Sequence, residues 1–171
     1  EIEETSIQVI SPTTAYQITS MLEGVIKRGT GRKLKSLEIP LAGKTGTTNK
    51  NMDTWFIGFT SKLVIGVYVG FDEPKTLGKY ETGAKVALPI FKDLIINLVK
   101  KSEAMPFKIP KGISFIMIDS DKGTFYAKDT KKTIFESYKT ANIEKAKLEL
   151  IQNKDKDISK YENKLKTLKF Y

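Results

Sequence analysis

Residues 41–49, LAGKTGTTN, decide the fold, because Lys44 in this stretch fits two different motifs and each motif requires a different structure. Gly43-Lys44-Thr45 resembles the end of a phosphate-binding loop, G-x-x-x-x-G-K-[ST], which must open a helix. Glu38 occupies the position of the first glycine in that pattern, so the wrapping loop is missing. The residues that follow Lys44, TGTTNKNMD, are mostly poor helix formers. The stretch is therefore predicted to be a strand, covering residues 39–47.

Two further strands are predicted directly after this one. Residues 54–60 and 63–71 are rich in Val, Ile, Phe, Tyr and Trp. Only Ser61 and Lys62 separate them, which indicates a tight antiparallel hairpin. The turn sequence NKNMD joins the first strand to the second. We therefore expect a three-strand antiparallel meander, with Trp55 and Phe56 in the core of the sheet.

Helices are predicted on both sides of the meander. Ser11 and Pro12 form a helix start, with a hydroxyl cap followed by proline in the first turn. Apolar residues at helical spacing then continue to Arg28, with Gly29 as the C-cap: Tyr16, Ile18, Leu22, Val25 and Ile26. Residues 29–37 are expected to be a loop.

A second helix is expected over residues 84–101, where it would cover one face of the sheet. Pro89 lies either in its first turn or at a kink. The fold class is thus α+β, an antiparallel sheet packed by helices.

The sequence divides into three parts by composition. Residues 1–104 form the main domain, residues 105–140 a linker with a small hairpin, and residues 141–171 a Lys-rich helical tail. The hairpin is predicted to pair residues 113–119 with residues 124–127. The tail carries Ile158, Tyr161, Leu165 and Leu168 at a coiled-coil-like spacing, for barely two turns.

Composition excludes several kinds of chemistry. The 171 residues contain no cysteine and no histidine, which excludes cysteine nucleophiles, Ser-His-Asp triads and zinc fingers. We expect no metal and no organic cofactor. The formal net charge of +9 would suit an anionic partner. The lysines are dispersed and interleaved with acidic residues, without an aromatic stacking pattern, so nucleic acid is not an expected partner.

A series of motifs around Lys44 gives a family resemblance. In order along the chain these are VISPTTAYQITSMLEGVIKRGTG, AGKTGTTN, DTWFIGFT, VIGVYVGFDEPKTLG, ETGAKVALPIF and FKIPKGI. The order and spacing resemble the transpeptidase domain of class A, bifunctional, penicillin-binding proteins, over about residues 7–113. The chain would then be the C-terminal portion of the fold that this domain shares with serine β-lactamases. A class A β-lactamase itself is disfavoured, because the chain extends past the end of a compact hydrolase.

The resemblance implies roles for the K-T-G strand. Lys44 would be catalytic, attracting the substrate carboxylate and supporting proton movement. The backbone N–H of Thr47 would be one donor of the oxyanion hole. Thr45, Gly46 and Thr47 would bind substrate, with Thr48 at the rim. The substrates of the intact enzyme would be D-Ala-D-Ala-type stem peptides of peptidoglycan, and β-lactams.

The nucleophile of that family does not occur in this sequence. No serine has a lysine three residues later, and no Ser-x-Asn stands where the second motif belongs. We expect the chain to be part of a longer protein, inactive alone, that associates with itself or with the missing N-terminal part. The alternative is a non-catalytic remnant or interaction module from a split gene. The family resemblance implies the periplasmic side of the cytoplasmic membrane of bacteria, with the anchor outside this chain.

Overall fold

A computed structural model of the chain describes residues 7–121 and 132–144, which belong to two compact units. One unit contains residues 19–108 and holds the predicted sheet. The other contains the residues before 19 and after 108. Each unit has its own apolar core. The domain bounds expected from composition stay a prediction.

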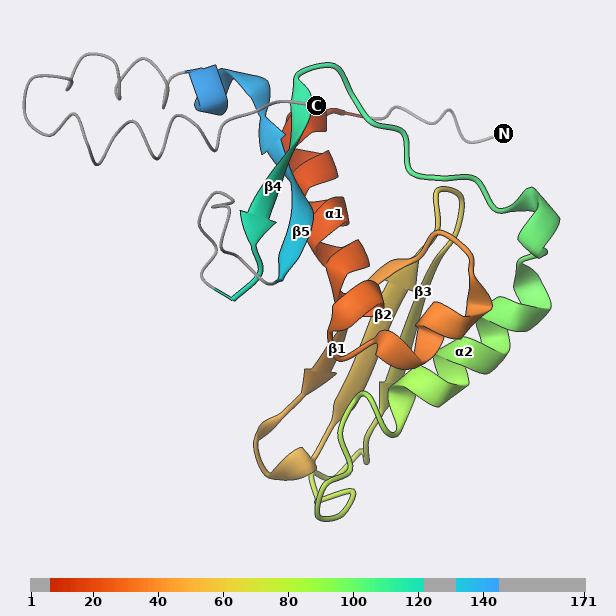
Figure 1. Cartoon of the computed structure of the whole chain (residues 1–171). Coiled ribbons are helices and arrows are strands. Elements are labelled where there is room, and N and C mark those ends of the chain that lie inside the picture. Colours follow the sequence, from red (N-terminus) through yellow and green to blue (C-terminus); the bar gives the residue numbers. More distant parts are fainter. Residues whose placement is uncertain (1–6, 122–131, 145–171) are drawn as a thin grey trace, which may run out of the picture. The chain divides into compact units, whose positions relative to one another are not determined.

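The unit of residues 19–108 is built on the predicted antiparallel meander (Figure 1). Its strands are β1 (Ala42–Thr47), β2 (Thr54–Phe59) and β3 (Val64–Val69), in the spatial order β1-β2-β3. Short 3₁₀ helices accompany them: η1 (Arg32–Leu37), η2 (Asn49–Asn51) and η3 (Lys101–Glu103). The fold class is α+β, as the sequence predicts, and β1 is an edge strand.

The β2–β3 hairpin closes without an Asn-Gly turn because Thr60 supplies the missing interactions. The Thr60 N–H donates to the Leu63 carbonyl at 2.9 Å. The Thr60 hydroxyl accepts the backbone N–H groups of Lys62 and Leu63 at 3.2 and 3.1 Å. A side-chain acceptor thus satisfies turn donors that the chain would otherwise leave to water.

Helix α1 (Pro12–Arg28) has the predicted bounds, and α2 (Ala87–Leu98) is shorter than predicted. Pro89 is the third residue of α2, inside the first turn, where its missing N–H costs no helical hydrogen bond. The expected loop of residues 29–37 is wrong in part. It contains η1, whose Leu34 is buried in the core, so tertiary packing orders this segment.

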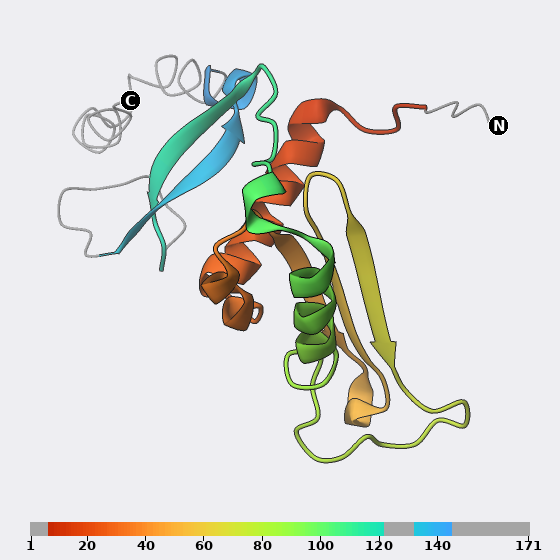
Figure 2. The same ribbon diagram turned by 90° about the vertical axis from the view of Figure 1, so that its right-hand side faces the viewer.

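Helix α2 packs along one face of the sheet, as both views show (Figures 1 and 2). Phe56 and Phe91 are buried there, with ring centroids 4.6 Å apart. The other buried members of this core come from both helices, η1, β3 and the residue before β1: Ile26, Leu34, Leu41, Val67, Ala87, Leu88 and Ile95. The prediction that Trp55 belongs to the core is wrong. Trp55 is 41% exposed, because strand alternation turns it to the face opposite Phe56.

The other unit contains a two-strand hairpin, β4 (Ile113–Asp119) and β5 (Thr133–Lys139). The expected partner, residues 124–127, lies outside the described residues, and β5 is the strand that pairs with β4. The start of α1 also belongs to this unit, with the Ser11 hydroxyl accepting the Thr14 N–H at 3.2 Å as an N-cap. The coiled-coil-like residues of the tail lie outside the described residues.

Candidate functional site

The outer edge of β1 presents backbone groups that β2 does not use. The N–H of Thr48, which is extended, donates to the Asp53 carbonyl at 3.0 Å, on the β2 side. Backbone groups of successive residues point to alternate sides of a strand. The N–H of Thr47 and both backbone groups of Thr45 therefore point to the free edge. The Thr45 carbonyl and the Thr47 N–H donor thus lie two residues apart along this edge.

The Lys44 side chain brings a cation to the same edge. Its ammonium donates to the Thr45 carbonyl at 2.8 Å and lies 3.4 Å from the Thr45 hydroxyl. Lys44 is exposed and forms no ion pair with a carboxylate among the described residues. An ammonium held beside a free N–H donor is an arrangement suited to an anionic group.

The side chains of Thr45 and Thr47 lie on the same face of the sheet as their register partners in β2, Phe56 and Thr54. The Thr47 hydroxyl accepts the Gly83 N–H at 3.0 Å, which leaves its own proton free to donate. The Thr45 and Thr30 hydroxyl oxygens are 2.9 Å apart. Neither Thr30 nor Gly83 was predicted to be a site residue. The motifs RGTG and ETGAK, in which they lie, were the signal that could have indicated them.

Gly46 lies on the opposite face of β1, against Trp55 of β2. A Cβ on Gly46 would be 3.1 Å from the Trp55 Cβ, which is tighter than nearly all real contacts. Trp55 in turn packs on Tyr68, with ring centroids 4.7 Å apart. The glycine of the K-T-G stretch therefore allows close approach of a neighbouring strand side chain in this structure.

Thr48 closes the loop that follows β1. Its hydroxyl accepts the Asp53 N–H at 2.8 Å and lies 3.4 Å from the Asp53 carboxylate. The other Asp53 carboxylate oxygen accepts the Tyr68 hydroxyl proton at 2.8 Å. This hydrogen bond, followed by desolvation and the negative charge of Asp53, raises the pKa of the Tyr68 phenol. Asp53 thus ties the loop after β1 to β3, as a structural acceptor.

The structure gives no support to a phosphate loop. Glu38, at the position where that pattern has glycine, adopts φ 54° and forms an ion pair with Lys101. The Lys101 hydrogen bond and charge lower the pKa of the Glu38 carboxyl. After β1 the chain enters the three-residue η2, in which Lys50 is left-handed, and no α-helix starts there.

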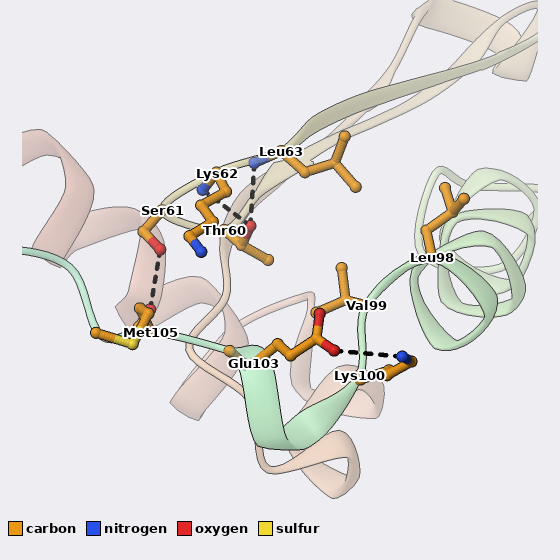
Figure 3. A pocket seen from close by; sticks show the side chains of 10 residues that line it. Thr60, Ser61, Lys62, Leu63, Leu98, Val99, Lys100, Glu103 and Met105 are labelled. Carbon is orange, nitrogen blue, oxygen red and sulfur yellow. Dashed lines mark hydrogen bonds and ion pairs between the residues drawn. The ribbon is translucent and has the colours of Figure 1, made fainter.

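A cavity of about 140 Å³ lies at the other end of the sheet, where the β2–β3 turn meets the end of α2 (Figure 3). Its lining includes Leu63, Leu98 and Met105, together with Lys62 and Lys100. Two of its lining residues are joined by a hydrogen bond, from the Ser61 hydroxyl to the Met105 carbonyl at 3.1 Å. None of the lining residues belongs to β1, so the cavity is separate from the K-T-G edge.

Two properties of the described residues bear on cofactors and membranes. No group of three or more acidic, histidine or cysteine side chains lies close enough together to hold a metal ion in that part of the chain. Among the same residues, no helix has the length and apolar character needed to cross a bilayer.

Comparison with known families places this fold and edge strand in a defined class. Residues 2–96 match the transpeptidase family described as the penicillin binding protein transpeptidase domain. This match covers more than half of the chain, and the chain therefore belongs to the penicillin-binding protein transpeptidase family.

The individual relatives are much longer proteins. Penicillin-binding protein 1A of Rickettsia conorii is 45% identical over 149 residues, which are 86% of this chain and 18% of that protein. Penicillin-binding protein 1A of Pseudomonas aeruginosa is 45% identical over 77% of this chain and 16% of its own length. The crystal structure of penicillin-binding protein 1A from Haemophilus influenzae superposes with a TM-score of 0.67 at 28% identity, covering 77% of this chain and 21% of that one.

Proposed function

We propose that this chain provides one wall of a serine D,D-transpeptidase site that cross-links peptidoglycan stem peptides. In this proposal Lys44 attracts the terminal carboxylate of the stem peptide and supports proton movement at the serine. The Thr47 N–H is one of two oxyanion donors. Thr45, Gly46 and Thr47 bind the substrate strand, and Thr48 stands at the rim.

The observation that carries the proposal is the direction of the Thr47 N–H. The Thr48–Asp53 hydrogen bond turns the Thr47 N–H to the free edge, beside the Lys44 ammonium. An oxyanion donor must be fixed before the charge develops, and a strand amide meets that requirement. The Thr47 hydroxyl, held by the Gly83 N–H, supports a role as a carboxylate donor.

The proposal assigns the nucleophile to a different segment. The 171 residues contain no Ser-x-x-Lys, so the wall alone has a cation and donors but no serine to acylate. We therefore expect no covalent adduct when the isolated chain is incubated with benzylpenicillin and its intact mass is measured. A stoichiometric increase equal to the mass of the penicillin would contradict this assignment.

A chimera tests the function directly. This chain should replace the matching segment of the Rickettsia conorii relative, which supplies the rest of a penicillin-binding protein. We expect the chimera to bind benzylpenicillin covalently, and to lose at least about a hundredfold in acylation rate on Lys44→Met. Lys62→Met is the matched control, since Lys62 lies in the hairpin turn at the other end of the sheet. A folded chimera without acylation would refute the transpeptidase assignment.

The site also implies partners and a location. We propose association with an N-terminal transpeptidase part, or self-association, through the sheet face opposite α2, where Trp55, Ile57 and Tyr68 are 41%, 48% and 50% exposed. Sedimentation of the chain should then reveal species above the monomer, and a stable monomer would count against it. We place the intact protein on the periplasmic side of the bacterial cytoplasmic membrane.

The alternative is a non-catalytic remnant or interaction module. The nucleotide sequence directly upstream discriminates between the two: an in-frame Ser-x-x-Lys favours the transpeptidase, and a stop or start codon favours the remnant.

A further inference from the structure

Thr30 lies in a rigid connection between α1 and η1. The N–H groups of Gly29 and Gly31 both donate to the Val25 carbonyl, at 3.0 and 3.1 Å. Both neighbours also lie close against the end of α1. A Cβ would lie 2.9 Å from the Val25 Cα at Gly29 and 2.7 Å from the Ile26 Cδ1 at Gly31. The chain on both sides of Thr30 is therefore fixed against the end of α1.

This connection places the Thr30 hydroxyl next to β1. The Thr30 and Thr45 oxygens are 2.9 Å apart, and the Lys44 ammonium is 3.4 Å from the same Thr45 oxygen. Within the part of the chain that the structure describes, the Thr30 side chain makes no other polar contact. Three polar groups thus meet at the edge of β1: the hydroxyls of Thr30 and Thr45 and the ammonium of Lys44.

The donor balance of this cluster permits a direction of hydrogen bonding that leaves one proton for an anion. An ammonium only donates, so the Thr45 oxygen accepts from Lys44. The oxygen can accept a second proton from Thr30. With both acceptor positions used, the Thr45 proton is the one that remains for a ligand, and the two donors polarise it.

We propose that Thr30 is a positioning residue that sets the Thr45 hydroxyl to donate to the carboxylate of the acyl-donor peptide or of a β-lactam. The proposal rests on the transpeptidase function proposed above and extends it to a residue outside the K-T-G strand. Because Thr30 acts through Thr45, its effect should appear only with ligands that carry that carboxylate.

The test compares Thr30→Val and Thr30→Ser in the chimera, with Ser36→Ala as the matched control. Ser36 lies in η1, which follows this connection, and its hydroxyl donates to the Lys33 carbonyl within the same short helix. For Thr30→Val we expect the second-order rate constant for acylation by benzylpenicillin to fall about tenfold. The fall should come from weaker apparent binding, with the limiting rate unchanged. The rate constants of Thr30→Ser and of the control should stay within about twofold of the parent, because both variants keep a hydroxyl group at residue 30.

Two comparisons separate positioning from a general structural effect. With the methyl ester of the same penicillin, Thr30→Val should equal the parent, since the ester lacks the anionic carboxylate. In a Thr45→Val background, Thr30→Val should cause no further loss. An unchanged rate with benzylpenicillin, an equal loss with the ester, or additive losses with Thr45→Val would each overturn the proposal.

A second arm does not depend on acylation. Binding of N-acetyl-D-alanyl-D-alanine to the 171-residue chain can be followed by NMR, with thermal unfolding as a check that each variant is folded. Thr30→Val should weaken binding about tenfold and Thr30→Ser should not. If the parent chimera fails to acylate, the transpeptidase assignment fails, and this arm still decides the role of Thr30. Equal binding by Thr30→Val, or no binding by the parent chain, overturns it.

Discussion

Gly83→Ala should disturb the K-T-G strand although residue 83 lies outside it. Gly83 is buried, and its N–H donates to the Thr47 hydroxyl at 3.0 Å. Its carbonyl accepts the Leu88 N–H at 2.8 Å, in the first turn of α2. Gly83 therefore connects the start of α2 to the strand that carries the candidate site.

The structure gives the size of the disturbance. A Cβ on Gly83 would lie 2.5 Å from the carbonyl oxygens of Gly46 and Trp55, about 0.9 Å inside ordinary van der Waals contact. Both atoms are backbone, in paired strands, so neither can turn aside as a flexible side chain would. Overpacking of this kind costs about 1–3 kcal/mol, and loss of the bond to Thr47 adds about 1 kcal/mol. The expected loss in the free energy of unfolding is about 2–4 kcal/mol.

Thermal unfolding followed by Trp55 fluorescence measures this loss, because Trp55 is the single tryptophan and its carbonyl is one of the contacted atoms. We expect Tm to fall by roughly 8 °C or more. Gly66→Ala is the matched control. Its Cβ would meet only the Ile57 side chain, at 3.9 Å, so it should change stability by less than about 0.5 kcal/mol. Equal Tm values for Gly83→Ala and the parent would refute the reasoning.

Two further predictions concern the surroundings of the strand. The Tyr68 phenol should ionise above its usual pKa, and Asp53→Asn should lower that pKa, as measured by phenolate absorbance against a Tyr68→Phe reference. Because the folded-state pKa is raised, the Tyr68–Asp53 hydrogen bond stabilises the folded protein below about pH 10, and this stabilisation is lost as pH rises through the folded pKa. An unshifted Tyr68 titration would contradict this prediction. Phe91→Ala should cost about 3–5 kcal/mol of unfolding free energy in urea denaturation, since Phe91 is 1% exposed and packs on Phe56. Ile90→Ala, at a position 44% exposed on the same helix, should cost well under half of that, and similar losses would count against the core assignment.

Sequence reasoning succeeds where the determinants are local. The bounds of α1 follow from the Ser11 cap and from the glycine after Arg28, all within one or two turns of the ends they define. The meander follows from three runs of strand-forming residues separated by short turns. These features need no knowledge of the rest of the fold.

The misses have non-local causes. Leu34 orders residues 32–37 because it is buried against distant elements, and β5 pairs with β4 across a separation that turn chemistry does not specify. In the candidate site, Thr30 and Gly83 reach Thr45 and Thr47 across 15 and 36 residues. The K-T-G strand could be located from its flanks. The groups that hold its hydroxyls could be found only once the chain was folded.

The free edge of β1 is the property on which the proposed site depends. Strand alternation alone would separate the Lys44 side chain from the hydroxyls of Thr45 and Thr47, which lie on the opposite face. The lysine stem is long enough to return its ammonium to the Thr45 carbonyl at the edge, where the Thr47 N–H also points. A strand paired along that edge would occupy this carbonyl and this amide together. Association along β1 would therefore close the proposed site, whereas association along the outer edge of β3, the other edge strand of this sheet, would leave it open.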